Sequence, residues 1–416
     1  MKRRVAITGL GVVTSLSCKV EDLWTRLCNG ESGVRLITRF DTTRFRVKFG
    51  GQLENWTTDG YLEGKGAKRI DRFAQFALVG AIDAVRDAGI DFSQIDPCRC
   101  GVTLGSGIGG LEEIETQHAR LLEKGPDKVS AFTIPKLMVN AASGQVAIQF
   151  GLRGPSQAVA TACASATNAI GEAFRAIQFG VADVMVTGGT EAAVTPMGIS
   201  AFAASRALSE RNDAPTKASR PWDVDRDGFV LSEGAGILVL EELELARRRG
   251  ARIYAELLGY GASCDAGHIT QPDKDGIGAA KAMELAVRDA GVDGTEVGYI
   301  NAHGTSTPLG DQAESAAIKA VFRDHAYKLC ISSTKSQLGH TLGASGGIEL
   351  VVTVLSLRDG IIAPTINLDT PDPACDLDYT PNTARQRNIS VAMSNSFGFG
   401  GHNASVVVSK LRNGSV

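Results

Sequence analysis

The sequence is poor in proline, in long apolar runs and in net charge, and each shortage excludes a class of protein. Thirteen prolines in 416 residues are about 3%, against an average near 5%, and no Gly-X-Y period occurs, so the chain is not a collagen. No apolar run reaches the roughly 18 residues of a transmembrane helix, so we expect no membrane insertion. The 43 basic and 46 acidic residues give a net charge of -3, which excludes a strongly basic nucleic-acid-binding protein.

Cysteine and glycine have informative distributions. The eight cysteines are scattered through a chain too long to need disulfides, so we expect reduced thiols and a cytoplasmic protein. Cys98 and Cys100 lack zinc-binding spacing and a second pair, so we expect no metal. The 48 glycines, about 11.5% against an average near 7%, indicate backbone that turns tightly or approaches other groups closely.

The N-terminus imitates a signal peptide, with basic residues followed by an apolar run. Thr8, Gly9 and Gly11 interrupt this run, and no clear cleavage site follows. We therefore interpret residues 4–8 as a first strand and the glycines after it as a turn.

Internal repeats predict a duplicated chain. Residues 84–91 return as residues 286–293 with seven of eight positions identical, and each copy ends a helical pattern at a glycine suited to a C-terminal cap. A weaker similarity pairs residues 164–180 with 344–360. Because the two similarities occur in the same order, duplication is a better explanation than chance.

Short apolar segments alternate with helical patterns, which is typical of an α/β protein with buried strands. The expected strands are 4–8, 101–104, 157–161, 183–187, 236–241, 253–258, 297–301, 329–332, 390–394 and 404–408. The expected helices are 70–88, 111–123, 164–179, 276–290, 311–323 and 344–358. No Pro/Ser-rich linker separates the halves, so we expect two tightly packed domains, 1–250 and 251–416.

A glycine-rich loop at residues 105–110 satisfies the G-x-G-x-x-G pattern of a dinucleotide site. It does not belong to the first strand–helix–strand unit, and no acidic residue ends a second strand about 20 residues later. A tight turn or a close approach of backbone is the favoured interpretation, and an NAD-dependent oxidoreductase remains an alternative.

Cys163 lies where an apolar strand ends and small residues open a helix. A thiol at a helix N-terminus is favoured as a thiolate, because exposed N–H groups and the helix dipole stabilise negative charge. A buried structural cysteine is the alternative, but this position makes Cys163 a candidate nucleophile.

Further candidates lie in the second half of the chain. His303, Lys335 and His340 occur in loops rich in glycine and hydroxyl residues, although a single histidine is more often structural. The segment 397–401 alternates phenylalanine with glycine. It could present N–H groups to an oxyanion between movable rings, or it could simply fill the core.

Together these segments resemble the β-ketoacyl-acyl-carrier-protein synthases, condensing enzymes of the thiolase fold. The resemblance runs from about Arg4 to Val408, and the Cys-His-His set is similar to that of the type II elongating enzymes. Initiating enzymes carry Cys-His-Asn, and thiolases need a second catalytic cysteine. The resemblance implies two βαβαβαββ halves stacked as five αβαβα layers, and a homodimer.

The resemblance also implies roles for individual residues. Cys163 would hold the acyl chain as a thioester, while His303 and His340 support decarboxylation of a malonyl thioester and Lys335 tunes them. The other implied roles are support of Lys335 by Glu349, an oxyanion hole and gate formed by Cys163, Phe399 and Phe397, pantetheine contacts by Thr305 and Thr307, and an acyl pocket walled by Ile108, Phe202 and Phe229. No tightly bound cofactor is implied, since the substrates are phosphopantetheine thioesters.

The implied partner is an acidic acyl carrier protein. Six basic residues fall where the family's docking patch would lie, or they are ordinary solvated side chains: Lys65, Lys68, Arg69, Lys124, Lys128 and Arg206. Two alternatives within the resemblance are a ketosynthase of a polyketide or other specialised pathway and a non-catalytic chain-length subunit. The intact Cys163 argues against the second alternative.

Overall fold

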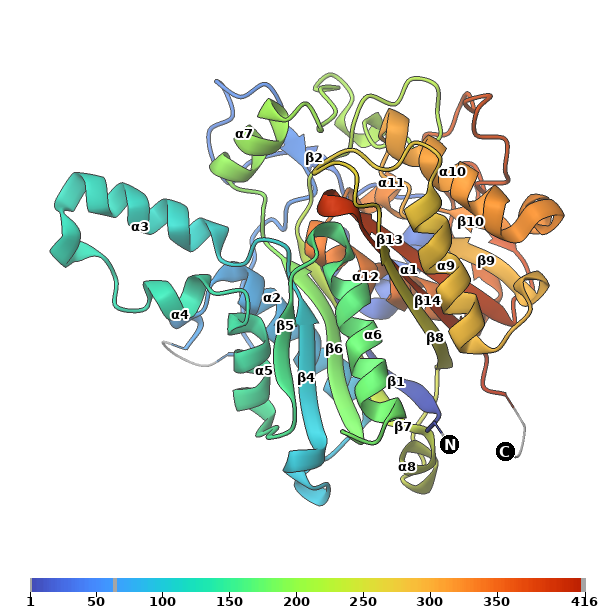
Figure 1. The fold of residues 1–416 in the computed structure, drawn as a ribbon. Helices are drawn as coiled ribbons and strands as arrows, with labels where there is room; N and C mark the ends of the chain where they lie inside the picture. The colour runs from blue at the N-terminus through green and yellow to red at the C-terminus, as the bar shows by residue number, and fades with distance from the viewer. Residues whose placement is uncertain (1, 63–65, 413–416) are drawn as a thin grey trace.

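A single ten-stranded sheet organises the fold, and half of its strands come from each half of the chain (Figure 1). The structure is a computed structural model that describes residues 2–62 and 66–412. Strands of the first half are β1 (Val5–Thr14), β4 (Cys100–Gly105), β5 (Ser156–Val159), β6 (Val184–Glu191) and β7 (Gly234–Glu242). Strands of the second half are β8 (Ala255–Cys264), β9 (Val297–Asn301), β10 (Cys330–Ser332), β13 (Val391–Gly398) and β14 (His402–Ser409).

The two halves of the sheet have the same topology, which confirms the duplication. The strand order is β5-β4-β6-β7-β1 in one half and β10-β9-β13-β14-β8 in the other. Each half has three parallel strands followed by two antiparallel ones. The halves join where β1 pairs with β8 through three residue pairs, so the two sheet layers are hydrogen-bonded to each other.

Helices complete five layers, as expected for the thiolase fold. The central layer is α6 (Ser165–Gln178) and α12 (Ser345–Asp359), which contact both halves of the sheet. The outer layers are α2 (Arg72–Ala88) with α5 (Ala141–Phe150), and α9 (Ile277–Ala290) with α10 (Pro308–Phe322). Every residue of α12 from Ser345 to Leu357 is buried, as expected for a helix enclosed by two sheet layers.

Shorter elements connect these layers. They are α1 (Val20–Cys28), α3 (Leu111–Lys124), α4 (Thr133–Leu137), α7 (Pro196–Ala204), α8 (Leu243–Arg248), α11 (Lys335–Leu338), β2 (Arg35–Leu36), β3 (Phe49–Gly50), β11 (Ile361–Ile362) and β12 (Arg385–Gln386). In Figure 1, α3 and the turn after it extend away from the body on the side of β5. Within the described ranges, no helix has the length and apolar character required to cross a membrane.

The ten predicted strands are the ten strands of the main sheet, and the six predicted helices are present within a few residues. Gly89 and Gly291 adopt left-handed conformations at the ends of α2 and α9, which confirms both caps. The predicted turn at Gly9 and Gly11 is wrong, because β1 continues to Thr14. Those glycines instead admit α2: a Cβ on either would lie about 2 Å from a backbone oxygen of that helix. The boundary at residue 250 stays a prediction.

Gly236→Ala tests the close packing of α12 on β7. A Cβ at this position would lie 2.1 Å from Ile348 N and 2.3 Å from Gly347 C, both backbone atoms of α12. We expect the substitution to lower the free energy of unfolding by about 3 kcal/mol, measured by chemical denaturation. Gly144→Ala is the control: its Cβ would meet no atom within 4 Å and it lies inside α5, so we expect a gain of about 0.5 kcal/mol. Equal stabilities for the two variants would contradict this account.

Candidate active site

Cys163, His303 and His340 converge at one cavity of about 400 Å³, although they come from distant parts of the chain. Cys163 follows β5, His303 follows β9 and His340 follows α11. The Sγ atom of Cys163 lies 3.0 Å from Nε2 of His340. The rings of His303 and His340 lie 5.3 Å apart at 84° to each other. The structure therefore brings together the three side chains that the sequence singled out.

Cys163 occupies a short 3-10 turn, Ala162–Ala164, directly before α6. The preceding Ala162 has a φ of 50°, a left-handed conformation that is uncommon outside glycine. Burial raises the pKa of the Cys163 thiol to about 12, while Lys335 and the Phe399 N–H lower it. Desolvation thus opposes the thiolate that the helix terminus favours, while the Lys335 charge and the Phe399 N–H support it. The thiol needs a base beside it, and His340 is in place.

The two histidines are buried as neutral imidazoles. Burial lowers the pKa of both well below 6.5, and the nearby Lys335 charge lowers it further. The Nδ1 atom of His340 lies 3.0 Å from Ser345 Oγ, whereas Nδ1 of His303 has no hydrogen-bond partner among the described residues. Both rings can therefore act as proton donors or acceptors without carrying charge.

Two buried carboxylates support this cluster. Glu349 on α12 forms an ion pair with Lys335, as the sequence predicted. Glu314 on α10 was missed: its oxygens accept hydrogen bonds from the N–H groups of His303, at 2.9 Å, and Gly304, at 2.8 Å. A glutamate in the helix after the histidine loop has no distinct sequence signal. Glu314 holds the backbone that carries His303.

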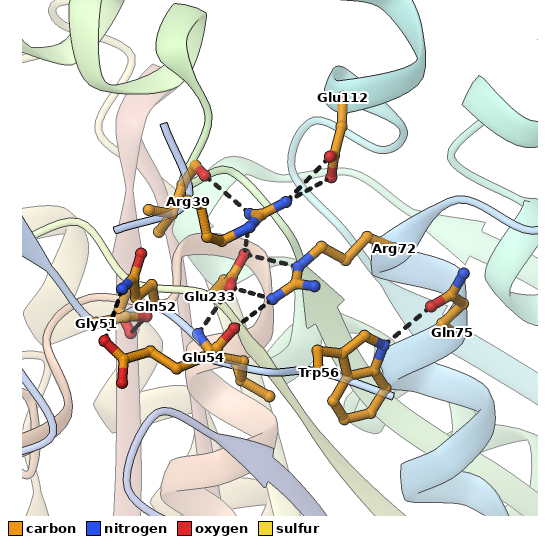
Figure 2. A network of polar contacts seen from close by, with 12 residues as sticks. Arg39, Gly51, Gln52, Glu54, Trp56, Arg72, Gln75, Glu112 and Glu233 are labelled. Carbon is orange, nitrogen blue, oxygen red and sulfur yellow. Dashed lines mark hydrogen bonds and ion pairs between the residues drawn. The ribbon is translucent and has the colours of Figure 1, made fainter. Parts of the chain in front are cut away.

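The backbone of His340 is held by the segment before β7. His340 N donates to Val230 O at 2.7 Å, and Ser232 N donates to His340 O at 2.9 Å. The next residue, Glu233, is fully buried and binds Arg39 and Arg72 (Figure 2). This polar network anchors the segment before β7, which in turn holds the backbone of His340.

The phenylalanine–glycine loop closes one side of the cavity. Phe397 and Phe399 line the cavity, and Phe399 begins a 3-10 turn that ends at Gly401. The backbone N–H of Phe399 is directed at the Cys163 sulfur, where it helps to lower the pKa of the thiol. A Cβ on Gly398 would lie 2.9 Å from Cys163 N, so glycine permits this approach.

The remaining predicted pocket residues lie around the same cavity. Thr305 and Thr307 line it, with their hydroxyls 3.0 Å apart. Phe202 and Phe229 also line it, in edge-to-face contact at 5.5 Å. Ile108 is not in the cavity lining but packs on the same apolar cluster as these two rings and Cys163. The apolar end of the cavity thus adjoins the thiol.

The glycine-rich loop at residues 105–110 surrounds a carboxylate of the protein itself. Glu191, at the end of β6, is fully buried. Its oxygens accept hydrogen bonds from Ser106 Oγ (2.9 Å) and from the N–H groups of Gly107 (2.7 Å), Ile108 (3.1 Å) and Gly343 (3.0 Å). These N–H groups are not free for a pyrophosphate, which favours the close-approach interpretation over a dinucleotide site.

The predicted basic docking residues are distributed over the surface. Lys65 lies outside the described residues, and the other five are exposed: Lys68 and Arg69 in the turn before α2, Lys124 at the end of α3, Lys128 in the next turn, and Arg206. Arg206 lines the cavity, and Arg69 stacks on Phe132 at 5.0 Å.

The three central side chains have a spacing that a soft metal ion could bridge. One ligand atom from each of Cys163, His303 and His340 lies within 4.8 Å of the others. Thiolate and imidazole are ligands that Zn²⁺ prefers. The absence of a metal in function stays a prediction, and the thiol and imidazoles alone form a nucleophile, a base and two donors.

Comparisons with known proteins agree with this geometry. Residues 2–246 match the N-terminal domain family of β-ketoacyl synthases, and residues 254–369 match the C-terminal domain family. A 3-oxoacyl-[acyl-carrier-protein] synthase 2 of Synechocystis sp. is 50% identical over 99% of both chains, and one of Coxiella burnetii is 51% identical over 99% of both chains. A ketosynthase solved with its type II polyketide acyl-carrier protein is 36% identical, with a TM-score of 0.92 over 99% of this chain and 100% of that one. The chain belongs to the β-ketoacyl synthase family.

Proposed function

We propose that this chain is an elongating type II 3-oxoacyl-[acyl-carrier-protein] synthase, which lengthens fatty acids by condensing malonyl-ACP with an acyl chain held on Cys163. The carrying observation is the buried thiol 3.0 Å from His340, with a second neutral histidine beside it. Full-length relatives that are 50–51% identical and bear this activity in their names support the proposal. No tightly bound cofactor is needed.

In the first half-reaction the acyl chain moves to Cys163. His340 Nε2 accepts the thiol proton as the sulfur attacks the acyl thioester carbonyl. The new S–C bond replaces the bond to the carrier thiol, which leaves with a proton. The N–H groups of Cys163 and Phe399 stabilise the oxyanion, and the direction of the Phe399 N–H toward the sulfur supports this role.

In the second half-reaction malonyl-ACP loses CO2. The electron pair of the broken C–C bond stays on the remaining thioester, which becomes an enolate. Neutral imidazole N–H groups of His303 and His340 stabilise the thioester oxygen as charge develops on it. The enolate carbon attacks the Cys163 thioester, forms the new C–C bond and breaks the S–C bond. The sulfur leaves as a thiolate and takes up a proton from solvent, which restores the thiol. Lys335, paired with Glu349, keeps the histidines neutral and in place.

The remaining site residues follow from the cavity. Thr305 and Thr307 hydrogen-bond the pantetheine arm, and Phe397 and Phe399 gate the malonyl subsite. Ile108, Phe202 and Phe229 enclose the acyl chain in the apolar cluster beside the thiol. An acidic carrier protein docks at the basic residues, of which Arg206 lies at the cavity itself.

A homodimer is supported by an asymmetry between the two edges of the sheet. The edge strand β10 is buried and Ile331 N donates to Asp378 O, whereas the matching edge strand β5 is exposed or half-buried. Exposed apolar side chains lie near that open edge, on or beside α3, α4 and α5: Ile114, Leu121, Leu122, Phe132, Ile134, Met138 and Ile148. A second copy would cover both features. The eight free cysteines support a reducing compartment and a cytoplasmic location.

A polyketide ketosynthase is the second candidate, supported by the structural similarity to a ketosynthase solved with a type II polyketide acyl-carrier protein, at 36% identity. A role in fatty acid elongation has stronger support, because the sequence identity to relatives named 3-oxoacyl-[acyl-carrier-protein] synthase 2 reaches 50–51%. The non-catalytic chain-length subunit is disfavoured by the intact thiol–imidazole pair.

Cys163→Ala removes the nucleophile, so we expect the formation of 3-oxoacyl-ACP to fall at least about 1,000-fold. Product formation from acyl-ACP and malonyl-ACP measures this, and mass spectrometry should find the acyl group on Cys163 of the wild type only. Cys98→Ala, at an exposed thiol, is the matched control and should retain activity. Formation of 3-oxoacyl-ACP by the Cys163 variant at the wild-type rate would contradict the proposed function.

His303→Ala and His340→Ala should each slow decarboxylation of malonyl-ACP by about 100- to 10,000-fold, because each removes a donor to the developing enolate. Release of CO2 measures the step separately from acyl transfer. His118→Ala, on the exposed face of α3, is the control and should match the wild type. Normal decarboxylation by both site variants would show that the assigned roles are wrong.

Decarboxylation should tolerate acid, because the lowered pKa keeps both histidines neutral as the pH falls through 6.5. An unperturbed imidazole would be only about one-tenth neutral at about pH 5.5, so a tenfold loss would contradict this account. We expect a rate at that pH within about twofold of the rate at about pH 7.5. The unfolded chain alone binds these protons below pH 6.5, which destabilises the fold in acid, so circular dichroism must verify folding at each pH.

A further inference from the structure

Glu191 is a buried acidic residue that the catalytic steps above do not use. Its side chain is fully enclosed at the end of β6, and all four of its hydrogen-bond donors are uncharged. Burial raises the pKa of this carboxyl, and the four hydrogen bonds counteract that effect. A carboxylate is costly to bury, so four converging donors indicate a built site for it.

The donors come from two loops that belong to different halves of the chain. Ser106, Gly107 and Ile108 lie in the loop after β4, and Gly343 lies in the 3-10 turn Leu342–Ala344 before α12. Oε1 takes the bonds from Ser106 and Ile108, whereas Oε2 takes those from Gly107 and Gly343. The carboxylate therefore fastens the first loop to the second.

Glycine makes this arrangement possible. A Cβ on Gly107 would lie 2.9 Å from Glu191 Oε2, and one on Gly343 would lie 2.7 Å from the same oxygen and 2.3 Å from Gly107 N. Any side chain at either position would push the loops apart or displace the carboxylate.

Both loops border the acyl end of the site. Ile108 packs in the apolar cluster with Cys163 and Phe229, and Leu342 lines the cavity and belongs to that cluster. The backbone N–H of Ile108 is itself a donor to Glu191, so the carboxylate determines where the Ile108 side chain projects.

We propose that Glu191 is a positioning residue for acyl-chain selectivity: it holds the Ile108 loop against the Leu342–Ala344 turn and so defines the wall of the acyl pocket. This inference rests on the proposed function, because it assigns the wall to an acyl chain on Cys163. The backbone of His303 is held by Glu314 and that of His340 by Val230 and Ser232, so neither backbone depends on a bond to Glu191. The His340 ring also contacts Ser345, the first residue of α12. Acyl selectivity and malonyl decarboxylation should therefore separate.

Glu191→Gln tests the inference with little change in shape. An amide has one acceptor oxygen and directs an NH2 group at the other pair of donors, so at least one backbone N–H loses its acceptor in either orientation. In a series of acyl-ACPs with saturated chains of different length, selectivity is the ratio of kcat/KM for the best chain to that for the worst. We expect this ratio to fall about tenfold. Decarboxylation of malonyl-ACP should stay within about twofold, a separation that general destabilisation does not produce.

Two further variants keep the experiment decisive. Glu241→Gln alters another fully buried carboxylate, on β7, that binds Thr8 and Arg249, so it should lower stability but keep the wild-type profile. Ser106→Ala removes one donor to Glu191 and should shift the profile in the same direction by about two- to threefold. It replaces Glu191→Gln if that variant does not fold.

The outcomes distinguish the two proposals. An unchanged chain-length profile in folded Glu191→Gln, or in Ser106→Ala where the first does not fold, overturns the role of Glu191. The same change of profile in Glu241→Gln overturns it as well, because the effect would then be general. A wild-type protein that condenses none of the chains overturns the proposed function instead.

Discussion

The close approach of backbone across the middle of the molecule is the constraint on which the site depends. Gly189 of β6, Gly236 of β7 and Gly347 of α12 leave no room for a Cβ, and Gly343 lies against the loop that follows β4. Only when the two halves pack this closely can the loop that carries Cys163 reach the loop that carries His340. The thiol of the first half then lies 3.0 Å from an imidazole of the second. Tight packing is therefore a condition for the chemistry as well as for stability.

Burial at this junction shifts the pKa values of the three side chains that meet there. It raises the pKa of Cys163 and lowers the pKa of both histidines, so the thiol and the imidazoles are neutral together. Among the described residues of this cluster, Lys335 forms an ion pair with Glu349, and Glu314 accepts hydrogen bonds from two backbone N–H groups. Neutral donors suit an enolate, because they stabilise charge that appears only as the reaction proceeds.

Local sequence patterns predicted the regular elements and singled out the three side chains that meet at the cavity, because strand patterns, helix patterns and motif residues are properties of short segments. All ten strands of the main sheet were found, whereas short helices such as α7 and α8 have too few turns for a clear pattern. Glu191 and Glu314 were missed, since a carboxylate that binds backbone N–H groups of a distant loop has no sequence signature. The sequence likewise did not show that burial opposes a thiolate at Cys163, because burial is set by the whole fold whereas a helix terminus is a local feature.

The duplication shows how one turn acquires two tasks. The repeat that aligns residues 164–180 with 344–360 places Cys163 opposite Gly343. Both occupy 3-10 turns whose first residue is left-handed, Ala162 with a φ of 50° and Leu342 with a φ of 48°. In the first copy the turn presents a thiol to the cavity. In the second it presents an N–H group to Glu191, which only glycine permits. A side chain at the second turn would separate the two loops that Glu191 joins, so glycine at this position is part of what holds those loops together.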